Sequence, residues 1–157
     1  MNALATIAAL VGVLAAGVIY GTDVFCALVQ RPALAQLDDA TMTAAMGRVH
    51  QYGDRRLPAP GVIGILAAAT ATAAAASGGS AASAAAAGLA LIAMLSWLGL
   101  YLRVAAPINR TLTAAALAHV TPGNARALQS RWDSIITARA LLMAAAVAGL
   151  AVSAATH

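Results

Sequence analysis

Residues 57–102 read LPAPGVIGILAAATATAAAASGGSAASAAAAGLALIAMLSWLGLYL, and this stretch contains no charged side chain. About 20 apolar residues cross the hydrocarbon core of a bilayer, so the stretch is long enough for two crossings. Its Ser-Gly-Gly-Ser segment at residues 77–80 has the composition of a turn and divides it. We therefore expect two membrane-spanning helices here, over residues 60–76 and 81–104.

The composition of the whole chain agrees with a membrane protein. Of its 157 residues, 62% are hydrophobic and only 9% are charged, whereas about a quarter of the residues in a soluble domain are charged. So few charges cannot cover the surface of a small soluble enzyme, and so apolar a chain is not disordered. The single cysteine, Cys26, excludes an internal disulfide. We expect one membrane domain over residues 1–157.

Each end of the chain supplies a further span. Residues 1–22 carry no ionisable side chain, and the apolar stretch resumes after Asp23. This pattern predicts a helix over residues 3–30, ended by Pro32 because proline interrupts a helix. Near the other end, Thr121-Pro122 is a favourable helix start, and the helix would continue into a span over residues 132–155. The predicted fold is an all-α bundle of four transmembrane helices.

Two polar regions, residues 31–58 and 105–131, separate these spans and each is expected to hold a short helix at the membrane surface. In the first region, Asp38 and Asp39 can cap the helix start, and Arg48 and His50 would lie near its end. The second region would hold a short helix ending at His119. The apolar face of the first helix, which would lie on the membrane or on the bundle, consists of Met42, Ala45, Met46 and Val49.

The basic residues indicate the orientation. All nine arginines lie in or near the two polar regions, whereas the N-terminus, the Ser-Gly turn and the C-terminus contain none. The positive-inside rule places the arginine-bearing side in the cytoplasm and both termini outside, as in a bacterial inner-membrane protein. The net charge of +4 is explained by these arginines, which act as a topology signal. Because the chain has no lysine and no basic helix face, we expect no nucleic-acid partner.

Asp23 and Arg139 are the two ionisable residues expected below this interface. Asp23 precedes Arg31 by eight residues and Arg139 follows Arg131 by eight, which is about 12 Å along a helix. Ionisable groups within a membrane are costly and usually face the bundle interior as pairs. We expect an ion pair between them, either at a functional site or as a purely structural contact.

Arg31 and Arg103 border the same end of the bundle. Anchoring at the membrane interface explains such arginines in general. Arg103, however, closes a span that also carries Trp97 and Tyr101. We interpret these four residues, together with Trp132, as candidate substrate-binding residues.

The two loop histidines, His50 and His119, suggest different chemistry. His50 is a candidate general base because the ordinary pKa of histidine lies near neutrality. A metal held by both histidines is an alternative, but the chain has no HxH or HxxxH spacing and no glutamate. We therefore predict no metal and no cofactor.

Gly17 and Gly21 form a GxxxG motif, which is typical of a close contact between membrane helices. The same motif serves packing within one bundle and association between copies. A homo-oligomer through this face is therefore one interpretation of the motif.

The order of several short motifs resembles a known family. The first helix ends in Gly21, Phe25 and then Pro32-Ala33-Leu34; Pro107-Ile108-Asn109 follows the third helix; and Trp132 precedes Arg139 by seven residues. Over nearly the whole chain this pattern resembles the DUF1772, or anthrone oxygenase-like, family of small four-helix membrane proteins. The chain has Ile136 where many members carry a polar residue.

The resemblance implies a function. Some members are similar to cofactor-free oxygenases that convert aromatic anthrones to anthraquinones. By position, Asn109, Trp132 and Arg139 would be the motif residues. A base, His50 or Asp23, would form a carbanion whose oxyanion is held by Arg139 and Asn109. The substrate would be a lipophilic small molecule that enters from the membrane lipid.

A non-catalytic bundle that binds a lipid or quinone, or serves as an accessory subunit, is the alternative. The two hypotheses differ in whether Asp23, Asn109, Trp132 and Arg139 line one accessible cavity or are sealed by packing. A transporter or channel is disfavoured, because the predicted spans offer little to form a polar path.

Overall fold

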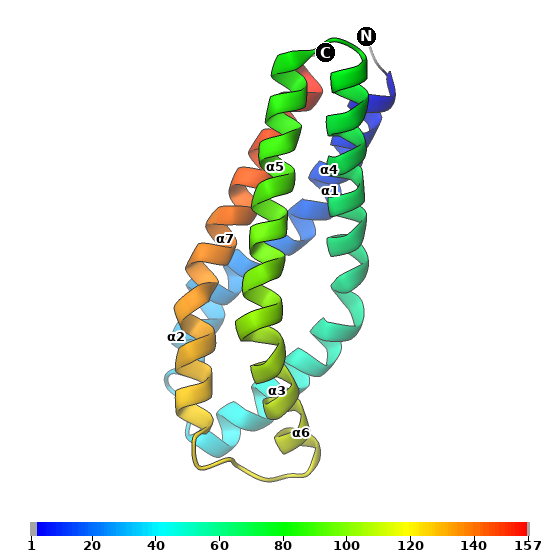
Figure 1. The fold of residues 1–157 in the computed structure, drawn as a ribbon. Helices are drawn as coiled ribbons and strands as arrows, with labels where there is room; N and C mark the ends of the chain where they lie inside the picture. Colours follow the sequence, from blue (N-terminus) through cyan, green and yellow to red (C-terminus); the bar gives the residue numbers. More distant parts are fainter. Residues whose placement is uncertain (1–2, 157) are drawn as a thin grey trace.

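The computed structural model describes residues 3–156, which form helices joined by short turns and contain no strand. Figure 1 shows the bundle. In chain order the elements are α1 (Ala3–Phe25), the π-helical turn η1 (Cys26–Gln30), α2 (Arg31–Leu34), α3 (Asp39–Arg56), α4 (Pro58–Ser77), α5 (Ala81–Leu100), the π-helical turn η2 (Tyr101–Ala105), α6 (Ala106–Leu117) and α7 (Ala125–Ala155).

Four helical runs are long and apolar enough to cross a membrane: Ala3–Leu34, Pro58–Ser77, Ala81–Leu117 and Ala125–Ala155. This confirms the predicted all-α bundle of four spans, and by length and composition the chain is an integral membrane protein. The span predicted over 60–76 is α4, whose observed bounds differ by one or two residues.

The helices run alternately up and down the bundle. Both termini and the turn between α4 and α5 lie at one end in Figure 1, whereas α2, α3 and α6 lie at the other. The two arginine-bearing regions therefore share one end of the molecule, as predicted. Helix α1 packs against α4 and α7, and α5 packs against the same two helices, so the four spans form a closed ring.

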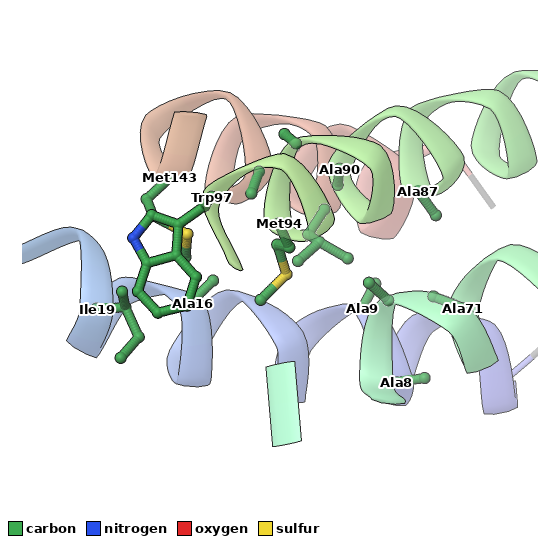
Figure 2. Close-up of a cluster of buried hydrophobic side chains, with 14 residues drawn as sticks. Ala8, Ala9, Ala16, Ile19, Ala71, Ala87, Ala90, Met94, Trp97 and Met143 are labelled. Atoms are coloured by element: carbon green, nitrogen blue, oxygen red, sulfur yellow. The ribbon is translucent and has the colours of Figure 1, made fainter. Parts of the chain in front are cut away.

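Small residues bring the spans close together near the termini. Figure 2 shows a core cluster in which most of the labelled side chains are alanines, with Trp97 at one end. A Cβ atom added at Gly149 would lie 2.8 Å from the carbonyl oxygen of Ala86, and one at Gly64 would lie 2.6 Å from Cε of Met94. The contact at Gly149 is with backbone and the contact at Gly64 is with a side chain, and small residues at both positions allow close van der Waals packing between membrane helices.

The first helical run does not end before Pro32, contrary to the prediction of a helix over 3–30. The helical run continues to Leu34, because the turn just before the proline widens to a π-helix, in which the Arg31 N–H bonds to the carbonyl of Cys26, five residues back. Proline lacks an N–H and its ring collides with the preceding turn of a regular helix, so the wider turn relieves both problems.

The third span repeats this arrangement. The Ala106 N–H bonds to the carbonyl of Tyr101, and Pro107 follows directly. The helix predicted over 81–104 therefore continues through α6 to Leu117. Both π-helical turns lie at the arginine-bearing end of the bundle.

Helix α3 lies across that end and packs on α6. Its start is capped as predicted: the Asp38 carboxylate accepts hydrogen bonds of 2.9 Å from the N–H groups of Ala40 and Thr41, and these bonds hold the pKa of Asp38 below its ordinary value. The helix extends to Arg56, so Arg48 and His50 do not lie near its end.

The last helix begins at Ala125, so the predicted helix start at Thr121-Pro122 is wrong. The Ala125 N–H bonds to the carbonyl of Pro122, so the proline lies in the turn that precedes the helix. The predicted span over 132–155 forms the greater part of the single helix α7.

The GxxxG motif makes no close contact within the bundle. A Cβ added at Gly17 or Gly21 would meet nothing within 4 Å. The tight helix crossings fall instead on other glycines, among them Gly12, Gly64 and Gly149.

We predict that Gly47→Ala destabilises the packing of α3 on α6. A Cβ at Gly47 would overlap the carbonyl oxygen of Leu112 and the methyl group of Ala116. Such overpacking costs typically 1–3 kcal/mol, so the free energy of unfolding, measured by SDS titration in mixed micelles, falls.

Gly53→Ala is the matched control on the same helix. Its new Cβ would meet only Cδ1 of Leu57, at an ordinary distance of 3.8 Å. Because alanine favours a helix over glycine by about 1 kcal/mol, this variant keeps or gains stability. Equal behaviour of the two variants would contradict the close crossing at Gly47.

Candidate functional site

A cavity of about 180 Å³ lies towards the arginine-bearing end, surrounded by segments of all four spans and by α3. Its lining is mainly apolar, and most of its wall comes from α1, α3 and α4. The polar or aromatic residues that line it are Thr22, Asp23, Cys26, Gln30, His50, Asp54, Trp97, Tyr101, Asn109, Trp132 and Arg139.

Asp23 and Arg139 form the predicted ion pair in the wall of this cavity. An Nη atom of Arg139 donates to Oδ1 of Asp23 over 2.8 Å, and both side chains are buried. The pair is not bidentate, because Oδ2 of Asp23 accepts a hydrogen bond of 2.7 Å from Nε1 of Trp97. Asp23 thus has a partner for each oxygen and is poorly placed to serve as a free base.

Three aromatic rings surround the Arg139 guanidinium. Its central carbon lies 5.2 Å from the ring centre of Trp97, 5.8 Å from that of Trp132 and 5.9 Å from that of Tyr101. Trp97 and Tyr101 are one helical turn apart and stack with an interplanar angle of 8°. Cation–π attraction in this desolvated setting adds to the ion pair and fixes the guanidinium.

A second polar network, centred on Asp54, was missed by the sequence analysis. One carboxylate oxygen of Asp54 accepts hydrogen bonds of 2.9 Å from both the Tyr101 hydroxyl and Nδ2 of Asn109. Oδ1 of Asn109 in turn accepts a bond of 3.0 Å from Nε1 of Trp132. The network joins α3, η2, α6 and α7.

Asp54 was missed because it precedes two arginines, and such a charge run usually marks a solvated helix end. The signal that would have found it is its spacing from His50, four residues earlier on α3, which places both on one face of the helix. In this network Asn109 uses its amide nitrogen as a donor and its amide oxygen as an acceptor, so the residue mainly positions its neighbours.

His50 is buried in the cavity wall and only 4% exposed. Its ring packs on Trp132 with centroids 5.6 Å apart, and neither ring nitrogen has a hydrogen-bond partner. The pKa of His50 is lowered to about 4, mainly by burial; the Asp54 carboxylate opposes this shift and the Arg139 cation adds to it. The imidazole is therefore neutral at physiological pH and can accept a proton.

Three predicted site residues lie away from the cavity. Arg31 is exposed, and Arg103 borders a separate shallow hollow on the outer face of α5, so neither lines the cavity as expected of substrate-binding residues. Both side chains are exposed, as expected because a buried, unpaired guanidinium is costly. His119 is exposed in the turn after α6, with a φ of 55°. Residues 3–156 contain no group of three or more His, Cys, Asp or Glu side chains that could hold a metal.

The four residues chosen to distinguish a functional site from sealed packing, Asp23, Asn109, Trp132 and Arg139, all line the one cavity. The rim of the cavity is exposed on α3 and α4, where Val49 is 48% and Val62 55% exposed. Exposed apolar side chains of α3 and α4 therefore border the cavity.

Comparison of the chain with models of protein families, with curated proteins and with solved structures found no match. The geometry of the cavity is therefore the basis for assigning a function.

We predict that Asp23→Asn destabilises the bundle strongly. Asparagine keeps an acceptor for Trp97 but leaves the Arg139 cation buried without a counter-charge, which costs roughly 3–5 kcal/mol in unfolding free energy. The double variant Asp23→Asn/Arg139→Gln removes both charges and is expected to recover much of this loss in the same SDS titration.

The exposed ion pair between Arg126 and Asp39 gives the control. Its side chains are 40% and 49% exposed and 2.8 Å apart. Asp39→Asn should cost less than about 1 kcal/mol, because water screens the pair. Two results would show that the buried charges do not depend on each other. One is a loss of unfolding free energy in Asp23→Asn that is no larger than the loss in Asp39→Asn. The other is no recovery of unfolding free energy in the double variant.

Proposed function

We propose that this chain is a membrane-embedded oxygenase that acts on a lipophilic aromatic molecule in the cavity beside His50. The observation that carries the proposal is a neutral, buried histidine with no hydrogen-bond partner in the wall of a mainly apolar cavity that also holds a fixed cation. The motif order that resembles the anthrone oxygenase-like family supports the same reaction class.

In the proposed reaction His50 takes a proton from a methylene group activated by a neighbouring aryl ketone. The electron pair left on carbon delocalises onto the ketone oxygen, where the unpaired Nε–H of Arg139 donates a hydrogen bond and the imidazolium formed on His50 balances the developing charge. Because a neutral base removes a proton from a neutral substrate, the resulting enolate and imidazolium add no net charge to the cavity.

The electron-rich carbanion then reduces dioxygen, and a carbon–oxygen bond forms. The peroxide takes the proton back from His50 to give a hydroperoxide. Loss of the remaining methylene proton and of hydroxide leaves a second ketone. One methylene and one dioxygen molecule thus become one carbonyl and one water, and the proposed reaction uses no metal or organic cofactor.

The substrate would reach the cavity from the membrane. The rim of the cavity at Val49 and Val62 is exposed and lies beside the apolar surface of the bundle. A lipophilic molecule dissolved in the membrane would be concentrated at this surface. Cys26 and Gln30 extend the wall on the α1 side, next to the π-helical turn that precedes Pro32.

We predict that purified protein in lipid vesicles consumes oxygen when anthrone is added, and that His50→Asn abolishes this uptake. The matched control is His119→Asn, which alters an exposed histidine in a left-handed turn that asparagine tolerates. Oxygen uptake measured with an electrode, alongside formation of anthraquinone, gives the readout.

The pH dependence sharpens this test. The neutral imidazole is the active form, and the pKa of His50 is about 4, so kcat/KM should stay level from pH 8 to about 5 and fall as pH decreases through about 4. A histidine with an ordinary pKa would lose activity below about 6.5. Binding of anthrone without oxygen uptake would contradict the proposed oxygenase activity and would favour the alternative of a bundle that binds a lipid or quinone.

We further propose that the arginine-bearing end faces the cytoplasm of a bacterial cell and that both termini lie outside. The support is the concentration of all nine arginines towards the end formed by α2, α3 and α6.

We predict that a membrane-impermeant maleimide labels Ser77→Cys in intact bacterial cells, and labels Thr121→Cys only after the membrane is opened. Ser77 lies at the α4–α5 turn and Thr121 before α7, at opposite ends of the bundle, and both are exposed. The native Cys26 is buried and gives no background. The reverse labelling pattern would invert the proposed orientation.

A further inference from the structure

Buried polar atoms without a partner are concentrated at the cavity. Within residues 3–156, six buried side-chain nitrogen or oxygen atoms have no hydrogen-bond partner. Four of these six belong to residues that line the cavity: both ring nitrogens of His50, Nε of Arg139 and Oε1 of Gln30. Because folded proteins leave few buried polar groups unpaired, this concentration points to a ligand that supplies the missing partners.

The three residues share one region of the cavity wall. His50 and Arg139 both face the Trp132 ring, at 5.6 Å between ring centroids and 5.8 Å from the guanidinium carbon. Nε2 of Gln30 donates to the sulfur of Met46 over 3.3 Å, and Met46 precedes His50 by one helical turn on α3. The unpaired amide oxygen of Gln30 therefore belongs to the same side of the cavity as His50.

The unpaired atoms require both donors and acceptors from the ligand. Nε of Arg139 carries a hydrogen and needs an acceptor, whereas Oε1 of Gln30 needs a donor. A neutral imidazole has one nitrogen of each kind. A hydroxyl group both donates and accepts, so it can satisfy the two types together.

The charge balance of the cavity favours a neutral ligand. Asp23 already compensates the Arg139 cation at 2.8 Å, and the carboxylate of Asp54 lies in the same wall. A carboxylate or phosphate group would therefore enter an apolar cavity that offers no net positive charge, and burial of an unpaired ion is costly. The aromatic side chains of Trp97, Tyr101 and Trp132 suit a ligand with an aromatic ring.

We infer that the cavity recognises a neutral aromatic hydroxyl group, whose hydrogen is donated to His50 or Gln30 and whose oxygen accepts from Nε–H of Arg139. The inference rests on the proposed function in placing the reacting molecule in this cavity, and it adds the polar group by which that molecule is held. It concerns binding and requires no turnover.

Quenching of intrinsic tryptophan fluorescence in detergent micelles at pH 7 tests the inference. The chain contains two tryptophans, Trp97 and Trp132, and both line the cavity. The probes are 1-naphthol, naphthalene, 1-methoxynaphthalene, which accepts but does not donate, and the 1-naphthoate anion. We expect 1-naphthol to bind at least about fivefold more tightly than naphthalene, with 1-methoxynaphthalene between them and 1-naphthoate weakest. Partitioning into the micelle alone would favour naphthalene.

Variants assign the preference to the cavity. His50→Phe keeps a ring against Trp132 but removes both nitrogens, and Gln30→Leu removes the amide; each should reduce the ratio of naphthol to naphthalene affinity. Gln129→Leu is the matched control, because Gln129 also has a buried, unpaired amide oxygen but does not line the cavity. This variant should keep the wild-type ratio.

The inference is overturned if the ratio in wild-type protein is one, if 1-naphthoate binds as tightly as 1-naphthol, or if Gln30→Leu and His50→Phe both keep the wild-type ratio. Gln30→Leu decides the matter if His50→Phe does not fold. Selective naphthol binding without oxygen uptake from either anthrone or a hydroxylated anthrone would support the hydroxyl site while refuting the oxygenase, so the two failures are distinguishable.

Discussion

The ion pair between Asp23 and Arg139 is the constraint on which the arginine-bearing half of the bundle depends. Two charges inside a membrane domain are tolerated only when each is compensated and hydrogen-bonded. Asp23 therefore takes one donor from Arg139 and one from Trp97. These bonds join α1, α5 and α7 at one depth, and the three aromatic rings around the guanidinium follow from the same need to surround a buried cation.

This constraint also explains why the cavity lies at the arginine-bearing end. Near the termini the spans meet through alanine and glycine, and their backbones approach closely. Farther along, the bulky side chains of Trp97, Tyr101, Trp132 and Arg139 must be accommodated between the same helices. These four side chains line the cavity, and α3 and α6 lie at the same end of the bundle and contribute to its wall. A site for a lipophilic molecule thus arises where close packing of small residues stops.

Parts of this arrangement were predictable from particular residues. Asp23 and Arg139 could be paired from the sequence, because each lies eight residues from an interfacial arginine and the two have opposite charge. Asp54 could have been placed beside His50 by its spacing, but only the position of α3 across the end of the bundle brings both to the cavity. Gln30 and Cys26 could not be assigned to the cavity, because their positions depend on the π-helical turn before Pro32. Arg31 and Arg103 were assigned to the site by their proximity in sequence to its members, but both are exposed and neither lines the cavity.

The sequence by itself determined the number of spans, the shared end of the arginines and the depth of the two buried charges, since these follow from hydrophobic length, charge position and the rise of a helix. The tertiary structure alone decided that helices continue past Pro32 and Pro107, that Asp23 binds Trp97 as well as Arg139, and that His50 remains without a partner beside an open space. Those outcomes depend on which face each helix turns toward its neighbours. In an alanine-rich chain that choice is set by the few large and polar side chains acting together, because the hydrophobic pattern is nearly the same on every face.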